Sequence, residues 1–103
     1  MGNGRFLPRQ TLNGYQLFIW NENKRRANIK KHGIDFEHVL DIFYDDYILI
    51  EDDRFDYGEQ RFWAIGFYKA KLIVVVHVYI RNDLVRIISA REATKQEYEQ
   101  YFE

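Results

Sequence analysis

The sequence predicts an α+β fold in a single domain, with an antiparallel sheet of four to five strands, two helices near the N-terminus and one helix at the C-terminus. Two observations support this prediction. Leu72–Ile80 is an unbroken apolar run rich in valine, which is typical of a central strand covered on both faces. Two helical patterns stand between the first strand and the others, and one follows the last strand; this order excludes repeated strand-helix-strand units.

The apolar run forms the first arm of a predicted hairpin. Arg81–Asp83 supplies residues that tolerate the positive φ values of a tight turn, and Leu84–Ala90 then returns antiparallel. Arg86 lies within this second arm, and Arg91 follows directly after it. Alternation places the two arginines on opposite faces of a straight strand, so only a twist or bend would bring both to one cleft.

Two helices are predicted between the first strand and the rest of the sheet. Tyr15–Trp20 is aromatic and β-branched, which favours a strand. Asn21 is a good N-cap, and the basic segment after it reaches His32 before Gly33, the residue type that commonly follows a helix C-terminus. A second helix follows Asp35. Its apolar residues recur at helical spacing, namely Phe36, Val39, Leu40 and Phe43.

The remaining elements are two strands and a last helix. Tyr47–Ile50 predicts a strand, and the polar stretch Glu51–Gln60 predicts a loop. Arg61–Tyr68 alternates as a further strand, with Arg61, Trp63, Ile65 and Phe67 on one face. Thr94–Glu97 has the pattern of a capping box, so a terminal helix begins there and carries Tyr98 and Tyr101 back toward the core.

The composition is that of one globular domain. The chain has 103 residues, 47% hydrophobic and 17% aromatic, and a domain of this size buries about two-thirds of its unfolded surface. Residues 1–14 hold three glycines and the only proline, so we expect a flexible N-terminal tail or a vector-derived remnant before a domain over residues 15–103. No apolar run approaches the roughly 20 residues of a membrane span. No cysteine is present, which excludes disulfides, and we expect a cytoplasmic location without membrane contact or cofactor.

Charge is segregated along the chain although the formal net charge is only −1. Residues 1–34 contain seven Lys or Arg and one acid, whereas residues 35–60 contain ten acids and one base. A protein of this kind can present a basic surface to a polyanion and an acidic surface to a basic partner. The alternative is that these charges are solvated faces of unrelated elements.

Two motifs are more specific than any single residue: Lys31-His32-Gly33-Ile34-Asp35-Phe36 and the closing Arg86-Ile87-Ile88-Ser89-Ala90-Arg91. The further matching positions are Trp20, Lys24, Asn28, Phe43, Asp56, Tyr57, Gly58, Glu59, Arg61, Gly66 and Ala93. In this order the residues resemble the BrnT family of type II toxins, from roughly Phe18 to Tyr101. Two departures are Asn21 in place of the usual Asp, and a hairpin that is one residue longer over His77–Arg81, which a β-bulge would accommodate.

The resemblance implies a RelE-like fold and a ribonuclease toxin of a type II toxin-antitoxin system. Such a toxin cleaves RNA without a metal ion and thereby inhibits translation. The resemblance also implies neutralisation by a BrnA-type antitoxin with a ribbon-helix-helix part, and homodimerisation within the toxin-antitoxin complex is an open alternative. The rival class is a non-catalytic module that binds nucleic acid or an acidic peptide through the same cations.

The sequence supplies the cations that this chemistry needs. RNA cleavage without a metal requires a base for the ribose 2′-OH, cations around the pentavalent phosphate and an acid for the leaving oxygen. The catalytic candidates are Arg91, Arg86, Arg61 and His32. The RNA-binding candidates are Lys24, Lys31 and Arg25. No carboxylate base is evident, so the base and acid would be His32, His77 or a tyrosine, or positioning alone would support a weak reaction.

Several candidates have a structural alternative. For Arg86 it is an ion pair with Asp83 or with an acid of the loop Glu51–Glu59. For His32 it is stabilisation of the helix dipole at a C-terminus. His77, in an apolar strand, is more often a hydrogen-bonded core residue than a catalyst. The three histidines lack metal-ligand spacing, so no metal site is expected.

The acidic loop is the candidate surface for the antitoxin. Its partner-binding candidates are Asp52, Asp53, Asp56, Phe55 and Tyr57. The carboxylates would attract a basic segment of the antitoxin while the aromatic rings anchor it. The alternative is that the aromatic rings complete the domain's own core, and that the antitoxin covers the basic cleft with an acidic segment.

Overall fold

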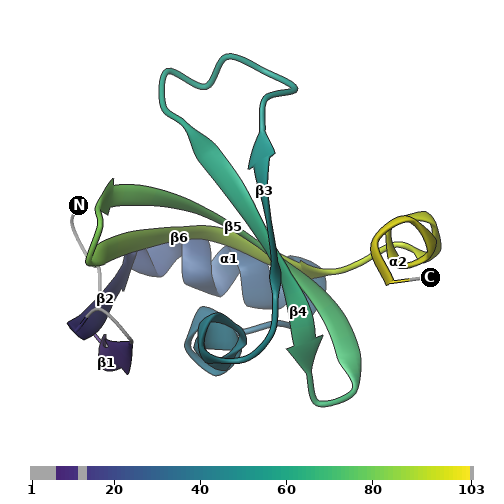
Figure 1. Cartoon of the computed structure of the whole chain (residues 1–103), viewed down its shortest axis with the longest axis horizontal. Coiled ribbons are helices and arrows are strands. Elements are labelled where there is room, and N and C mark those ends of the chain that lie inside the picture. Colours follow the sequence, from purple (N-terminus) through teal and green to yellow (C-terminus); the bar gives the residue numbers. More distant parts are fainter. Residues whose placement is uncertain (1–6, 12–13, 103) are drawn as a thin grey trace.

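The chain folds into an α+β domain, seen in a computed structural model that describes residues 7–11 and 14–102 (Figure 1). The strands are β1 (Leu7–Thr11), β2 (Gly14–Trp20), β3 (Ile48–Asp52), β4 (Arg61–Tyr68), β5 (Lys71–Arg81) and β6 (Leu84–Glu92). The helices are α1 (Glu22–His32), the 3-10 helix η1 (Phe36–Tyr44) and α2 (Lys95–Phe102). The predicted α+β class is confirmed. Of the helices in the described ranges, none is long and apolar enough to cross a bilayer.

The strands form one mixed sheet in the order β1-β2-β6-β5-β4-β3. The prediction of an antiparallel sheet is wrong for one pair, because β2 runs parallel to β6 from Leu17 beside Leu84 to Trp20 beside Ile87. A parallel pair requires a long crossover, and the chain between β2 and β6 supplies it with α1, η1 and three strands. Five strands, β2 to β6, come from the predicted domain. β1 lies within residues 1–14, where residues 1–6 and 12–13 are outside the described part.

β5 lies inside the sheet, between β4 and β6, as its continuous apolar run predicts. Its residues alternate between two cores. On the η1 face, Ile73 and Val75 join the larger cluster with Phe36 and Val39 of the 3-10 helix. On the α2 face, the buried side chains are Ile65, Leu72 and Val74, and Tyr101 and Phe102 of α2 pack against them. β5 is therefore covered by η1 on one face, and by α2 on the other face at the end that carries Leu72 and Val74, which explains the lack of polar alternation there.

The predicted second helix is the 3-10 helix η1. The carboxylate of Asp35 caps it by accepting the backbone N–H of Glu37 at 3.0 Å. With three residues per turn, positions 36, 39 and 42 align, and Ile42 is buried. Phe43, which an α-helical spacing places on the apolar stripe, is only partly buried.

Gly66 allows η1 to approach β4 closely. A Cβ atom at this position would lie 2.7 Å from Cγ2 of Ile42 and 3.3 Å from Cβ of Tyr47. Real side chains do not come so close, so a larger residue would push apart η1 and the turn that leads into β3. Gly66 is one of the positions that match the family pattern, and the close packing of η1 on β4 explains why a glycine is needed there.

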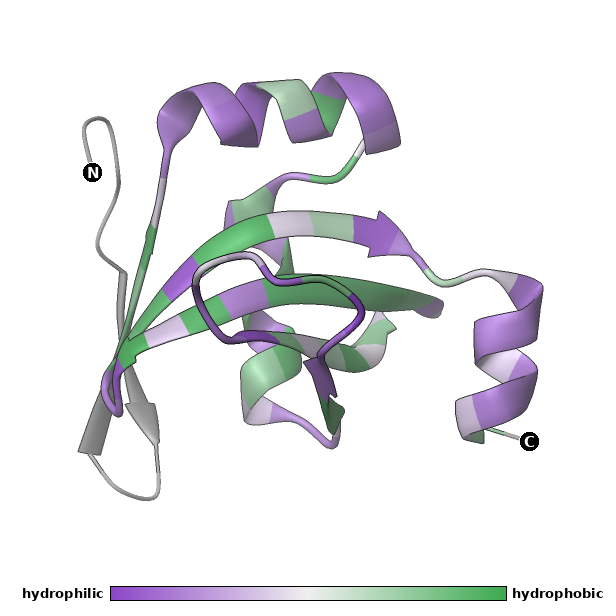
Figure 2. Ribbon diagram, turned by 90° about the horizontal axis from the view of Figure 1, so that it is seen from above, coloured by the Kyte–Doolittle hydropathy of each residue, from purple (hydrophilic) through white to green (hydrophobic). Residues whose placement is uncertain are grey.

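α1 has almost no apolar face. Asn21 caps it by accepting the N–H of Lys24 at 3.1 Å, and Gly33, with φ of 70°, ends it. Figure 2 shows α1 as a predominantly hydrophilic helix, in contrast to the more hydrophobic η1. Hydrophobic packing therefore contributes little to holding α1 in place, and Asn28 is its single buried residue.

The side chain of Asn28 joins α1 to β6. Its Nδ2 donates to the carbonyl oxygens of Ala90 at 2.8 Å and Ile34 at 2.9 Å, and its Oδ1 accepts the N–H of Ala90 at 3.1 Å. Pairing with β2 ends at Ile87, so no strand lies beside Ala90 on that side in the described chain. The amide takes the place that a residue of a neighbouring strand would occupy beside Ala90.

Replacing Asn28 with alanine should destabilise the fold. The substitution leaves the buried N–H and C=O of Ala90 without partners, which should lower the free energy of unfolding by about 2 to 4 kcal/mol. Urea unfolding followed by circular dichroism measures this loss. Asn23→Ala is the matched control. Asn23 is exposed on the same helix, and the change from asparagine to alanine raises helix propensity by the same amount at both positions. Equal unfolding free energies for the two variants would contradict a structural role for Asn28.

Candidate functional site

A β-bulge brings Arg86 and Arg91 to the same face of the sheet. Ile88 is an extra residue of β6 with no partner on β5, so the alternation of side chains reverses there. Arg86 lies opposite Val78 and Arg91 lies opposite Val74, and these two valines share one orientation on β5. The bulge is thus the bend that the sequence analysis required, and both arginines project from the α2 face.

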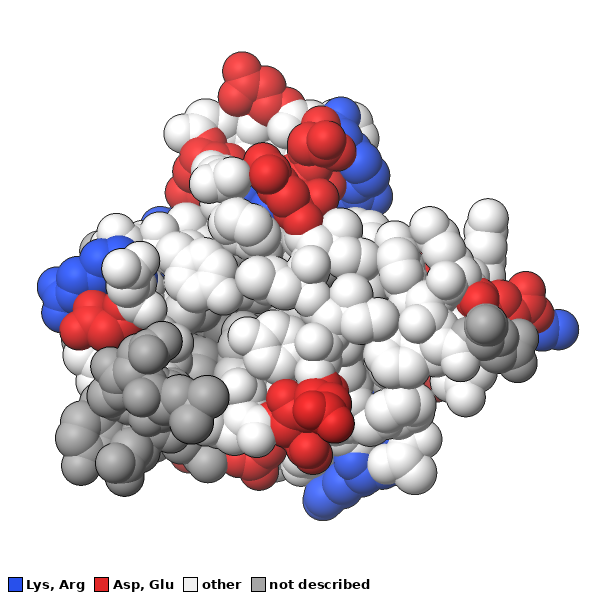
Figure 3. Space-filling model, viewed as in Figure 1, with Lys and Arg blue, Asp and Glu red and all other residues white. Residues whose placement is uncertain are grey.

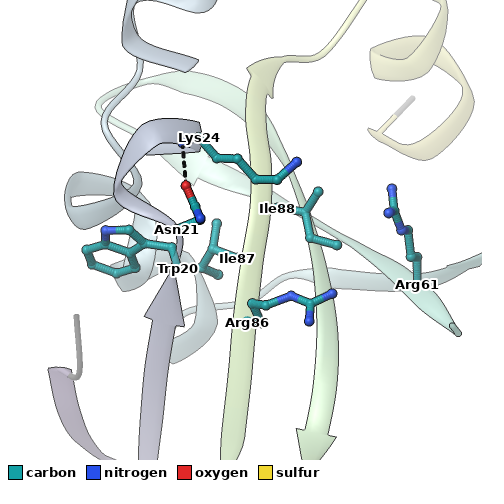
Figure 4. Close-up of a pocket in the computed structure, with 7 residues that line it drawn as sticks. All are labelled: Trp20, Asn21, Lys24, Arg61, Arg86, Ile87 and Ile88. Carbon is teal, nitrogen blue, oxygen red and sulfur yellow. Dashed lines mark hydrogen bonds between the residues drawn. The ribbon is translucent and has the colours of Figure 1, made fainter. Parts of the chain in front are cut away.

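A pocket of about 280 Å³ opens between the start of α1 and the strands β6 and β4 (Figure 4). Three cations from three elements line it: Lys24 from α1, Arg86 from β6 and Arg61 from β4. The other lining residues are Trp20, Asn21, Ile87 and Ile88. Figure 4 shows the three cationic side chains arranged around Ile88, the bulge residue. We call this site the α1 pocket.

Glu59, at the end of the acidic loop, lies among these cations. Nη2 of Arg86 is 2.7 Å from both of its carboxylate oxygens, and Nη2 of Arg61 is 3.4 Å from Oε2. The hydrogen bond from Arg86 holds the pKa of Glu59 below its usual value, although partial burial opposes the shift. The carboxylate is therefore ionised at neutral pH.

Glu59 was not among the predicted site residues. The one signal for it was its place in the motif Asp56-Tyr57-Gly58-Glu59. Its ion pair with Arg86 joins residues 27 positions apart and has no local pattern. The structural alternative for Arg86, an ion pair with an acid of this loop, is present in the structure.

Arg61 is held by stacking as well as by charge. Its Cζ lies 4.1 Å from the ring centroid of Tyr57, and the Tyr57 hydroxyl donates to Asp52 at 3.0 Å. Asp52 is buried and also accepts two bonds from Arg54, at 2.8 and 3.1 Å. These contacts fix the base of the acidic loop beneath Arg61, so the guanidinium is presented to the α1 pocket in one orientation.

Arg91 belongs to a second group of cations near the end of α1. It forms two hydrogen bonds to Glu97 of α2, at 2.7 and 2.9 Å, and its Cζ lies 5.4 Å from the ring of Trp63. Partial burial lowers the pKa of His32, and the charges of Lys31 and Arg91 lower it further. The predicted single cleft is therefore two groups of cations. One lines the α1 pocket, and the other gathers Lys31, His32 and Arg91.

Two predicted participants have internal roles. Arg25 forms ion pairs with Glu22 and, at 2.9 Å, with Asp35, so its guanidinium ties the start of α1 to the start of η1. His77 is fully buried, with Nδ1 3.1 Å from the carbonyl oxygen of Val75. Burial lowers the pKa of His77 to about 4. His77 is thus a neutral core residue, the alternative that the apolar strand favoured.

The acidic loop keeps only part of its predicted partner surface exposed. Asp53, Phe55 and Asp56 are exposed, and Phe55 is the most exposed of the large hydrophobic residues described, at 65%. Asp52 and Tyr57 are turned inward, bonded to each other as described above. Figure 3 shows acidic side chains gathered over the tip of this loop. No group of three or more histidines and acids placed for a metal ion occurs in the part of the chain that the structure describes.

Comparison with known proteins assigns the chain to a class. A family model described as "Ribonuclease toxin, BrnT, of type II toxin-antitoxin system" matches residues 20–97. The crystal structure of the Brucella abortus ribonuclease toxin BrnT is similar with a TM-score of 0.61 and 28% sequence identity, over 74% of this chain and 94% of that chain. No match was found among curated proteins.

The fold and the family match together define a ribonuclease toxin of a type II toxin-antitoxin system. The match spans most of the chain and includes both the α1 pocket and the second group of cations. The chain belongs to the BrnT family. Membership implies an RNA target and an antitoxin partner.

The ion pairs of the site should make stability depend on pH in the acid range. Hydrogen bonds from Arg54 and Arg91 lower the pKa values of Asp52 and Glu97 to about 2. A carboxyl group with a lowered pKa stabilises the fold above its ordinary pKa and loses that contribution as pH falls toward the folded value. Unfolding free energies should therefore decrease from about pH 4.5 to about pH 2, by on the order of 2 kcal/mol for each group.

Urea unfolding at pH 7 and pH 3 measures this dependence. Asp52→Asn and Glu97→Gln should each lower stability at pH 7 and reduce the difference between the two pH values. Asp83→Asn is the control, because the Arg81–Asp83 pair is exposed at the hairpin turn. A pH dependence unchanged in both test variants would exclude these carboxylates as its source.

Proposed function

We propose that the chain is an endoribonuclease that cleaves RNA without a metal ion at the α1 pocket and thereby inhibits translation. The observation that carries this proposal is the Glu59 carboxylate, held between Arg86 and Arg61, two of the three cations that line the α1 pocket. An ionised carboxylate and converging cations are the two kinds of group that attack by a ribose 2′-OH requires. A cytoplasmic location and a RelE-like fold are further parts of the proposal.

Each group has a distinct role in the proposed reaction. Glu59 accepts the proton of the 2′-OH as the oxygen attacks the adjacent phosphorus. The bond from phosphorus to the 5′-oxygen breaks, a 2′,3′-cyclic phosphate is formed, and the leaving 5′-oxygen takes a proton from water or from His32. Arg86 and Arg61 donate to the phosphate oxygens as negative charge accumulates in the pentavalent state, because a planar guanidinium matches two oxygens at once. Lys24 adds a point charge on the same phosphate.

The second group of cations extends the RNA path. Arg86 and Arg91 lie opposite residues four apart on β5, which separates them by about 13 Å along the strand. This distance is too long for one phosphate, so Arg91, Lys31 and His32 would bind the backbone next to the cleaved bond. In this arrangement His32 is a candidate for protonating the leaving oxygen only if the RNA bends toward it.

The decisive experiment is cleavage of RNA by the purified chain in excess chelator. Arg86→Ala and Glu59→Gln should each reduce the rate about a hundredfold or more, since each removes on the order of 3 kcal/mol of transition-state stabilisation. Arg81→Ala is the matched control, because this arginine is also ion-paired but lies at the exposed hairpin turn. Gel analysis of the products measures the rates.

The same assay tests the alternative of a non-catalytic binding module. Binding of RNA without scission, measured by fluorescence anisotropy, would replace the nuclease proposal with that module. Unfolding measurements on Arg86→Ala separate a catalytic loss from a structural one, since a purely structural ion pair would lower stability and leave the rate of the folded fraction unchanged. Cleavage that disappears in chelator would contradict the metal-independent mechanism.

We further propose that a BrnA-type antitoxin with a ribbon-helix-helix part neutralises the toxin, and that the complex contains two toxin chains. The exposed acids Asp53 and Asp56, with Phe55 between them, are the favoured contact surface. Their charge and the exposed ring suit a basic segment with an apolar anchor. Asp52 and Tyr57 contribute by holding the loop in shape.

Charge reversal distinguishes this surface from the basic cleft. Asp53→Lys with Asp56→Lys should weaken binding of the co-expressed antitoxin at least tenfold and change its dependence on salt, because two attractive rim charges become repulsive. Surface plasmon resonance at two salt concentrations measures both effects. The paired control is Lys24→Glu with Lys31→Glu. Loss of antitoxin binding in that control alone would assign the antitoxin to the cleft instead.

A further inference from the structure

β3 is an open edge of the sheet with an apolar centre. It pairs only with β4 within the described chain, so its outer backbone groups face no strand there. Its residues Ile48, Leu49 and Ile50 carry no charge, and the side chain of Leu49 is 46% exposed. Native proteins usually protect such an edge with lysine, proline or a covering element, because it can pair with another chain.

The two ends of β3 are acidic. Asp45 and Asp46 stand before it, and Glu51 and Asp53 stand at its other end; all four are exposed. Figure 3 shows these two acidic regions, one above and one below a largely uncharged surface, on the face where Figure 1 places β3 in front. Arg54 does not neutralise the upper region, because its guanidinium is bonded to the buried Asp52.

This charge pattern opposes pairing of β3 with a second copy of itself. In an antiparallel pair of two such edges, each acidic end would lie beside the other acidic end of the partner strand. In a parallel pair, like ends would meet directly. Carboxylates placed opposite one another in a sheet are destabilising. The edge therefore favours a strand of opposite charge.

We infer that the outer edge of β3 binds an extended segment of the antitoxin, which adds one strand to the sheet through backbone hydrogen bonds. The chemistry of the edge defines that segment: lysine or arginine at both ends, and β-branched apolar residues in the middle against Leu49. Strand addition of this kind combines affinity from the backbone with specificity from alternate side chains. The inference rests on the proposed toxin function for the identity of the partner, but the edge itself contains no residue of the α1 pocket.

A synthetic peptide tests the edge without RNA or antitoxin. The probe has two lysines at each end and three valines between them, and it is titrated into the isotope-labelled full chain. Backbone amide signals of Ile48–Asp52 should shift on binding, and high salt should weaken the binding. A second peptide with proline as the central residue should not bind, since proline removes a backbone donor. Equal binding of both peptides, or shifts confined to α1 and β6, would overturn strand addition.

Leu49→Lys and Ile80→Lys form a matched pair of variants. Leu49 and Ile80 are 46% and 45% exposed, but Ile80 lies at the tip of the hairpin, away from the edge. Leu49→Lys should weaken peptide binding about tenfold or more, whereas Ile80→Lys should leave it within about twofold. Identical affinities in the two variants would contradict the proposal.

The same two variants then identify the partner. Selective loss of antitoxin affinity in Leu49→Lys, with RNA cleavage unchanged, supports the antitoxin segment as the occupant. Peptide binding at the edge with full antitoxin affinity in both variants would overturn that occupant. A concentration-dependent dimer of the isolated chain, abolished by Leu49→Lys in sedimentation measurements, would instead assign the edge to a second copy. Failure of the nuclease proposal would leave the peptide result unaffected.

Discussion

The position of α1, and with it the α1 pocket, depends on the bonds between the side chain of Asn28 and the backbone of Ala90. β6 continues past the end of β2, which would leave buried backbone groups without partners. One amide side chain supplies both a donor and an acceptor to Ala90 and adds a bond to Ile34. Because α1 has almost no apolar face, this contact takes the place of most of the hydrophobic packing that usually holds a helix. It holds a helix that is almost wholly polar, and therefore free to present cations, against the core of the domain.

The site that results is a set of exchangeable ion pairs instead of an uncompensated basic surface. Arg86 is bonded to Glu59, and Arg91 is bonded to Glu97. In the proposed function, a phosphate that enters would compete with carboxylates already in place, so the free energy of RNA binding would be a difference between two charge-assisted contacts. Under the proposed function, this exchange would let a chain with a formal net charge of −1 bind a polyanion. It also lowers affinity for any anion that does not match the fork of the guanidinium, which favours selectivity over strength.

Local sequence patterns predicted the helices and strands well. They predicted less well which strands pair and which distant residues come together. The apolar run of β5, the caps Asn21 and Asp35 and the capping box before α2 are signals within a few residues, and each has its counterpart in the structure. The parallel pairing of β2 with β6 was missed, because the choice of partner strand depends on contacts far apart in the chain. For the same reason Glu59 was missed at the pocket. The bulge at Ile88 is a one-residue irregularity that no periodicity shows, yet it decides the face from which Arg91 projects.

The contacts of Trp63 have a consequence for how this protein can be observed. The chain contains two tryptophans, and Trp20 is buried in the core with 1% of its surface exposed. Trp63 is partly exposed and lies within 4.8 Å of the Arg54 guanidinium and 5.4 Å of that of Arg91. An indole ring beside two cations senses their field directly. Its emission therefore reports on the acidic loop and on the second group of cations at once, while Trp20, which lines the α1 pocket, adds a separate contribution, so the native chain contains its own optical labels.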